Sequence, residues 1–141
     1  MDSQKIKKEF EQIILSELVR TPLPYVQNDS IRIGKVVITP KTDGYSVYNL
    51  STKQKLGKTL SKRAAIALAR ICSTDCTTAQ VQNILSLDRS YNKYQADCVF
   101  YLHTIHQTKD SMKREMTEMR YDDAVDRKQT YAEKINKFIF S

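Results

Sequence analysis

The sequence predicts an α+β protein in which a three-stranded antiparallel sheet with flanking helices precedes a helical hairpin. Two helical stretches space their apolar residues three and four apart, and the residues between them alternate with period two. A seven-residue repeat of apolar positions follows in the second half. The 141 residues are 40% hydrophobic and 28% charged, which fits one folded unit.

The first predicted helix covers residues 3–20. Its apolar side chains share one face: Ile6, Phe10, Ile13, Ile14 and Leu18. Pro22 and Pro24 end this helix, because proline has no amide donor and disfavours helix at the preceding residue. We expect an extended arm from Thr21 to Ser30 that contacts neighbouring subunits.

Three strands are predicted next. Residues 31–38 read as one strand bent at Gly34, residues 44–50 (GYSVYNL) as the second and residues 55–60 (KLGKTL) as the third. The Asp43–Gly44 pair is a typical turn signal between the first two.

A second helix, KRAAIALARI, is predicted after Ser61, whose hydroxyl can accept a hydrogen bond from a free amide of the first turn. This helix completes an α-β-β-β-α module over residues 1–72. Residues 73–141 are expected to form a helical hairpin, and the two parts are expected to make one compact unit or two closely packed subdomains.

The predicted hairpin has an apolar position every seventh residue, at Tyr91, Cys98, Ile105, Met112 and Met119. The turn is placed either at 108–111 or at 119–123. Stripes of methionine and tyrosine on helices usually belong to a core or to a contact between subunits. We therefore expect subunit contacts at Tyr91, Tyr94, Tyr101, Met112, Met116 and Met119.

Positive charge is concentrated in the middle of the chain. The net charge is +7, yet residues 31–72 carry nine basic residues and one acidic residue, while residues 73–141 carry ten of each. Such a patch attracts polyanions, either nucleic acid or an acidic protein, with Tyr45 and Tyr48 adding contact area. The candidate residues for an anionic partner are Lys35, Lys53, Lys55, Lys58, Lys62 and Arg63.

The sequence carries no catalytic signature, and no enzyme, cofactor or metal is expected. The three glycines are scattered, so no phosphate-binding loop is present. Cys72 and Cys76, and His103 and His106, lack the spacing typical of zinc sites. An odd set of three cysteines without an export signal favours reduced thiols, and no apolar stretch predicts a membrane span.

The predicted module resembles the double-stranded RNA-binding domain over residues 3–72. The resemblance is carried by its element order and by Ser61, Lys62, Arg63 and Ala65 at the start of the last helix; Ile66 departs from the basic residue of that family. It implies contacts from the helix start to RNA phosphates.

Most of the chain also resembles small proteins of marine T4-like tailed bacteriophages. The stretches that carry this resemblance are residues 31–70, YQADCVFYLHTI and RYDDAV. It implies a non-enzymatic structural component of the virion, or a protein of the infected host cytoplasm, that contacts other virion or assembly proteins within an oligomer. The alternative is an accessory protein that binds DNA or RNA through the basic module.

Overall fold

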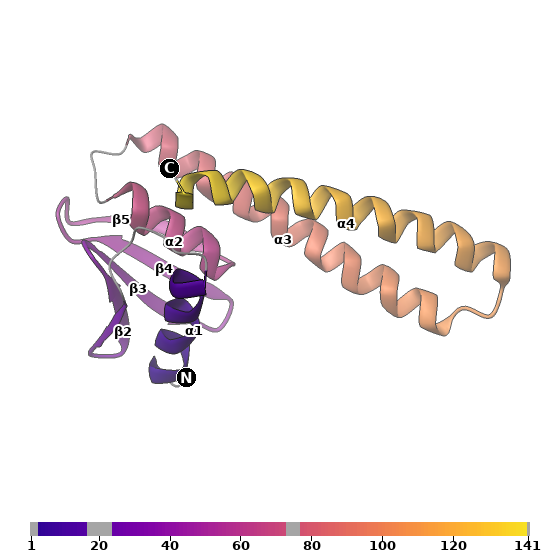
Figure 1. Ribbon diagram of the computed structural model, residues 1–141, viewed down its shortest axis with the longest axis horizontal. Helices are drawn as coiled ribbons and strands as arrows, with labels where there is room; N and C mark the ends of the chain where they lie inside the picture. Colours follow the sequence, from indigo (N-terminus) through magenta and orange to yellow (C-terminus); the bar gives the residue numbers. More distant parts are fainter. Residues whose placement is uncertain (1–2, 17–23, 73–76, 141) are drawn as a thin grey trace.

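The structure is a computed structural model that describes residues 3–16, 24–72 and 77–140. It confirms the α+β class, with one antiparallel sheet and a carboxy-terminal pair of long helices (Figure 1). The elements in chain order are α1 (Ser3–Ser16), β1 (Tyr25–Gln27), β2 (Ser30–Ile33), β3 (Val36–Lys41), β4 (Gly44–Asn49), β5 (Gln54–Thr59), α2 (Lys62–Ile71), α3 (Thr78–Gln107) and α4 (Ser111–Phe140).

The sheet has five strands in the order β1-β2-β3-β4-β5, so the prediction of three strands is wrong. Gly34 has a φ of 60°, and the chain reverses there into a hairpin between β2 and β3 where one bent strand was predicted. The predicted arm at 21–30 contributes β1, which pairs with β2; residues 21–23 lie outside the described part.

One face of the sheet is covered by α1 and α2. Alternate strand residues point into this core, among them Ile31, Ile33, Ile38 and Val47. On α2 the predicted bounds and the Ser61 cap are confirmed, since the Ser61 hydroxyl accepts from the Ala64 amide. Four alanines of α2 are buried, which lets the helix lie close to the strands.

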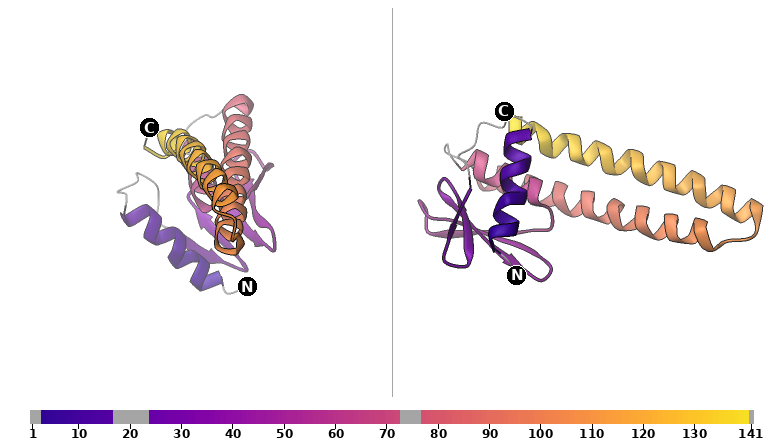
Figure 2. Two further views of the ribbon diagram at one scale, coloured as in Figure 1. Left: turned by 90° about the vertical axis from the view of Figure 1, so that its right-hand side faces the viewer. Right: turned by 60° about the horizontal axis from the view of Figure 1, so that its bottom comes forward.

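The two long helices run antiparallel and extend well beyond the sheet and α1 (Figures 1 and 2). The chain turns at residues 108–110, the first of the two predicted positions, and the Asp110 carboxylate accepts from the Met112 amide at 3.0 Å. Near the sheet Ile84, Leu85, Ile135 and Ile139 join the main core. Farther out each helix packs only against the other.

A buried carboxylate joins the base of this hairpin to the sheet. Asp88 on α3 is 1% exposed and accepts from the Leu60 amide at 2.6 Å, the Ser61 amide at 3.2 Å and the Ser61 hydroxyl at 2.6 Å. The Asn92 side-chain amide adds a fourth bond at 3.0 Å. The turn from β5 into α2 is thereby tied to the third helical turn of α3.

A glycine allows the same base to pack closely. Gly57 on β5 has a φ of +147°, and a Cβ atom there would lie 2.7 Å from Leu85 Cδ1 on α3. Only glycine adopts this backbone conformation without strain. The β5 backbone and α3 are therefore in direct contact at this point.

We expect Asp88→Asn to lower the free energy of unfolding by about 2 kcal/mol, because one carboxylate oxygen becomes an NH₂ group that faces an amide donor. Urea denaturation measures the loss. Asp122→Asn on the exposed surface of α4 is the matched control, and an equal effect of both substitutions would contradict the role of Asp88.

We expect Gly57→Ala to destabilise the protein by about 2 kcal/mol through backbone strain. The control is Gly34→Asn, since asparagine tolerates the left-handed turn conformation that Gly34 adopts. Thermal denaturation of both variants tests this, and a Gly57→Ala protein as stable as Gly34→Asn would refute it.

Candidate functional site

The six predicted basic residues do not form one patch. Lys62 lies on the helix-covered side, where its ammonium pairs with the Glu9 carboxylate at 2.7 Å and lies 5.7 Å from the Tyr45 ring centroid. The hydrogen bond from Lys62 lowers the pKa of Glu9. Arg63 donates to the Asn136 side chain at 2.9 Å. Both cations thus join helices within the fold, so the cluster at the start of α2 is engaged internally.

The other four lysines lie at two ends of the sheet. Lys58 pairs with Asp43 of the β3–β4 turn. Lys35 and Lys53 occupy the β2–β3 and β4–β5 turns at the opposite end, and Lys55 is on β5 beside them. These two turns lie side by side, because the Leu50 amide donates to the Lys35 carbonyl at 2.9 Å.

The sheet face opposite the core presents a row of side chains from all five strands. Strand pairing aligns Tyr25, Arg32, Val37, Tyr48 and Lys55 across the sheet. The Arg32 Nε donates to the Gly34 carbonyl at 2.9 Å, which directs its guanidinium toward the two turns. Tyr25 is 48% exposed and Tyr48 is 37% exposed.

We call this surface the sheet platform and define it as Tyr25, Arg32, Lys35, Tyr48, Lys53 and Lys55. The acidic residues of the five-stranded region, Asp29 and Asp43, lie in the turns at the other end of the sheet. Tyr25 and Arg32 were not among the residues predicted to contact an anionic partner, although the alternation of Arg32 with Ile31 and Ile33 is a strand signal.

The distal half of the hairpin has a thin interior. Its buried residues are Cys98, Ile105, Thr117 and Ala124, of which only Ile105 is a large apolar side chain. Closer to the sheet, the Tyr94 and Tyr131 rings stack with centroids 5.7 Å apart. Two helices alone cannot enclose a wide apolar core, so large side chains on the outer positions remain in solvent.

Six large apolar side chains on this half are 42% to 73% exposed. We call them the distal apolar surface: Val99, Phe100, Leu102, Met112, Met116 and Met119. The three methionines were predicted as contact residues, and the structure leaves them accessible. Val99, Phe100 and Leu102 on α3 were not predicted as contact residues, because the heptad pattern identifies the inner seam and not the outer positions.

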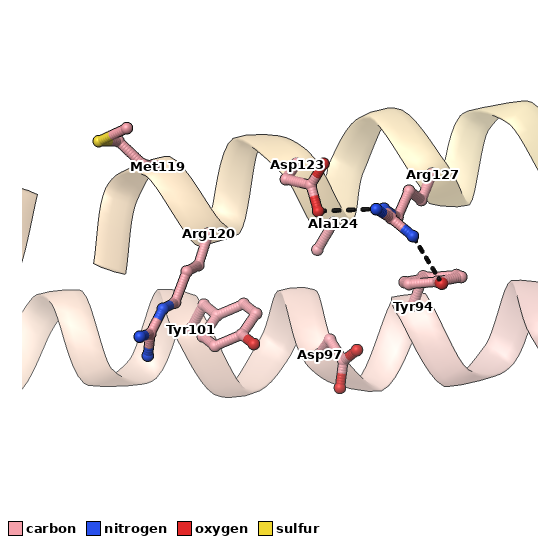
Figure 3. Close-up of a pocket in the computed structure, with 8 residues that line it drawn as sticks. All are labelled: Tyr94, Asp97, Tyr101, Met119, Arg120, Asp123, Ala124 and Arg127. Atoms are coloured by element: carbon pink, nitrogen blue, oxygen red, sulfur yellow. Dashed lines mark hydrogen bonds and ion pairs between the residues drawn. The ribbon is translucent and has the colours of Figure 1, made fainter. Parts of the chain in front are cut away.

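The three predicted tyrosines are less exposed. Tyr91 packs against the main core, whereas Tyr94 and Tyr101 line an open groove of about 350 Å³ between α3 and α4 (Figure 3). Arg127 bridges this groove, pairing with Asp123 at 3.1 Å and donating to the Tyr94 hydroxyl at 3.4 Å. Arg120 reaches from α4 to the side of Tyr101 (Figure 3). The groove is thus bordered by charges of both signs.

The described ranges contain no group of three or more His, Cys, Asp or Glu side chains arranged to hold a metal ion. His103 and His106 are exposed on α3, while Cys72 and Cys98 are buried free thiols; Cys76 lies outside the described residues. Within 3–16, 24–72 and 77–140, every helix is too short or too polar to cross a bilayer.

Comparison with known proteins adds no relative: no family model matches the chain, and neither a curated protein nor a solved structure does.

Proposed function

We propose that the protein is a non-enzymatic assembly component that associates through the distal apolar surface of its hairpin, with a second copy of the same hairpin as the partner. The exposure of six large apolar side chains on one projecting element carries this proposal. Large apolar side chains grouped on one exposed element of a folded chain are typical of a protein–protein contact.

The construction of the hairpin supports a helical partner. Two antiparallel helices with apolar side chains left outside are half of a four-helix bundle, which a second pair completes. Methionine suits such a contact, because its flexible side chain adapts to an irregular opposing surface. Phe100 supplies a larger, more rigid anchor.

The charge distribution favours a second copy as the partner. Residues 73–141 carry ten basic and ten acidic residues, so two hairpins meet without net repulsion. The borders of the groove likewise hold both signs, since Arg120, Arg127, Asp97 and Asp123 all line it. The strongly basic module would repel its own copy, whereas docking through the hairpin tips keeps the modules apart.

The length of the hairpin permits that separation. Each long helix has 30 residues, and a helix rises about 1.5 Å per residue, which makes each helix of the hairpin about 45 Å long. An antiparallel overlap of the distal halves therefore leaves one basic module at each end. Coulomb repulsion between modules held this far apart is screened at physiological ionic strength.

We expect replacement of Met112, Met116 and Met119 together by glutamine to weaken self-association at least about tenfold. A tenfold change corresponds to about 1.4 kcal/mol, and burial of three methionine side chains contributes more than that. Glutamine keeps side-chain length and helix propensity. Sedimentation equilibrium of the full chain over a range of concentrations measures the dissociation constant.

The matched control replaces Leu15 and Leu50, two exposed leucines of the module, by glutamine and should leave association unchanged. A wild-type chain that stays monomeric at its highest soluble concentration would refute the second-copy proposal. Equal weakening by the control would show that the contact lies elsewhere.

The resemblance to phage proteins extends the proposal to the wider assembly, where the neighbours are other components of a virion. If so, mass spectrometry of purified particles finds the chain at a fixed copy number that survives high-salt washing. Absence from the particles, with the chain present in the infected cell, would assign it instead to the host cytoplasm during infection.

A further inference from the structure

We infer that the sheet platform is a separate binding site, independent of the hairpin, and that its ligand is single-stranded nucleic acid. Four cations and two exposed tyrosines occupy one end of an open sheet face. On this inference the nucleic acid contacts the sheet, and not the start of α2 as the resemblance to the double-stranded RNA-binding domain implies.

The cations of the platform converge because of the backbone. The hydrogen bond from the Leu50 amide to the Lys35 carbonyl holds the two turns together, so the turns that carry Lys35 and Lys53 are neighbours. Arg32 is directed toward the same end by its bond to Gly34, and Lys55 ends the row of paired strand residues on β5. With the acidic turn residues at the far end of the sheet, this surface attracts a phosphate backbone.

The tyrosines distinguish a nucleic acid from other anions. Tyr25 is aligned with Arg32 and Tyr48 with Lys55, so each exposed ring has a cation beside it. Three strand spacings separate the tyrosines, a distance of roughly 14 Å, which spans two to three nucleotides of an extended strand. Stacking of unpaired bases on such rings is the usual basis of single-strand binding.

The backbone at Lys53 allows its charge to be removed without loss of stability. Its φ of 57° lies in the left-handed region, where glycine or asparagine is less strained than lysine. Asparagine at this position therefore removes the positive charge and relieves the strain in the same substitution.

The direct test is fluorescence anisotropy of the full-length protein with a labelled oligothymidine of about 15 nucleotides, titrated at several salt concentrations. If each of the four cations neutralises one phosphate, the slope of log K against log salt is roughly −3 for a single strand. A duplex of the same length should bind more weakly, since its bases are not free to stack.

Two variants locate the site. Lys53→Asn combined with Lys55→Gln should reduce the magnitude of the salt slope by about 1.4, while relief of the strained turn leaves the protein at least as stable as the wild type. Tyr48→Leu should weaken binding about tenfold through lost stacking, with the salt slope unchanged.

The matched control removes two lysines from the hairpin tip, by Lys109→Asn with Lys113→Gln, and should leave binding unchanged. If replacement of Lys109 and Lys113 weakens oligonucleotide binding as much as replacement of Lys53 and Lys55, the platform is not the binding site. Equal affinity for the duplex would overturn the single-strand assignment. Binding of poly-glutamate as tight as that of the oligonucleotide, unaffected by Tyr48→Leu, would assign the surface to an acidic protein and refute the inference.

Discussion

The carboxylate of Asp88 is the constraint on which the arrangement of the molecule depends. It is buried, and it is acceptable there because four donors surround it, two of them backbone amides at the junction of β5 and α2. Those amides lie just before the first turn of α2, where no intrahelical acceptor is available to them. The Asp88 side chain therefore accepts from the amides that follow β5, fixes the Ser61 residue that caps α2, and holds α3 against this junction. The direction in which the hairpin of α3 and α4 projects depends on this junction.

Much of the fold could be predicted because the local signals are strong. The apolar spacing and cap of α2 reproduced its bounds, and alternation located β4 and β5. The predicted number of strands was wrong because Gly34 is compatible with either a bend within one strand or a turn between two. The pairing of Ile33 with Val36, which the sequence does not reveal, shows that it is a turn. β1 is three residues long, which is too short for an alternating pattern to identify, and it is a strand because it pairs with β2.

The candidate sites were predicted less well, for a physical reason. A count of charges along the chain cannot tell which lysines an internal partner engages, and Lys62, Arg63 and Lys58 all have one. In the hairpin, the heptad of apolar residues runs across the turn at 108–110. Cys98 and Ile105 therefore remain on the inner seam, whereas Met112 and Met119 belong to the next helix and face outward. The same spacing thus describes a core on one side of the turn and an exposed surface on the other.

The two surfaces are also electrostatically distinct, and this matters for how they can coexist. The platform belongs to a region with an excess of eight positive charges, while the hairpin is neutral overall and apolar at its far end. A polyanion bound at the platform is not drawn along the hairpin, because charges of alternating sign there cancel within a Debye length. Conversely, apolar contact at the tip is insensitive to salt concentrations that release a polyanion. On the two proposals, ionic strength is expected to separate the interactions, since one depends on counterions and the other on buried area.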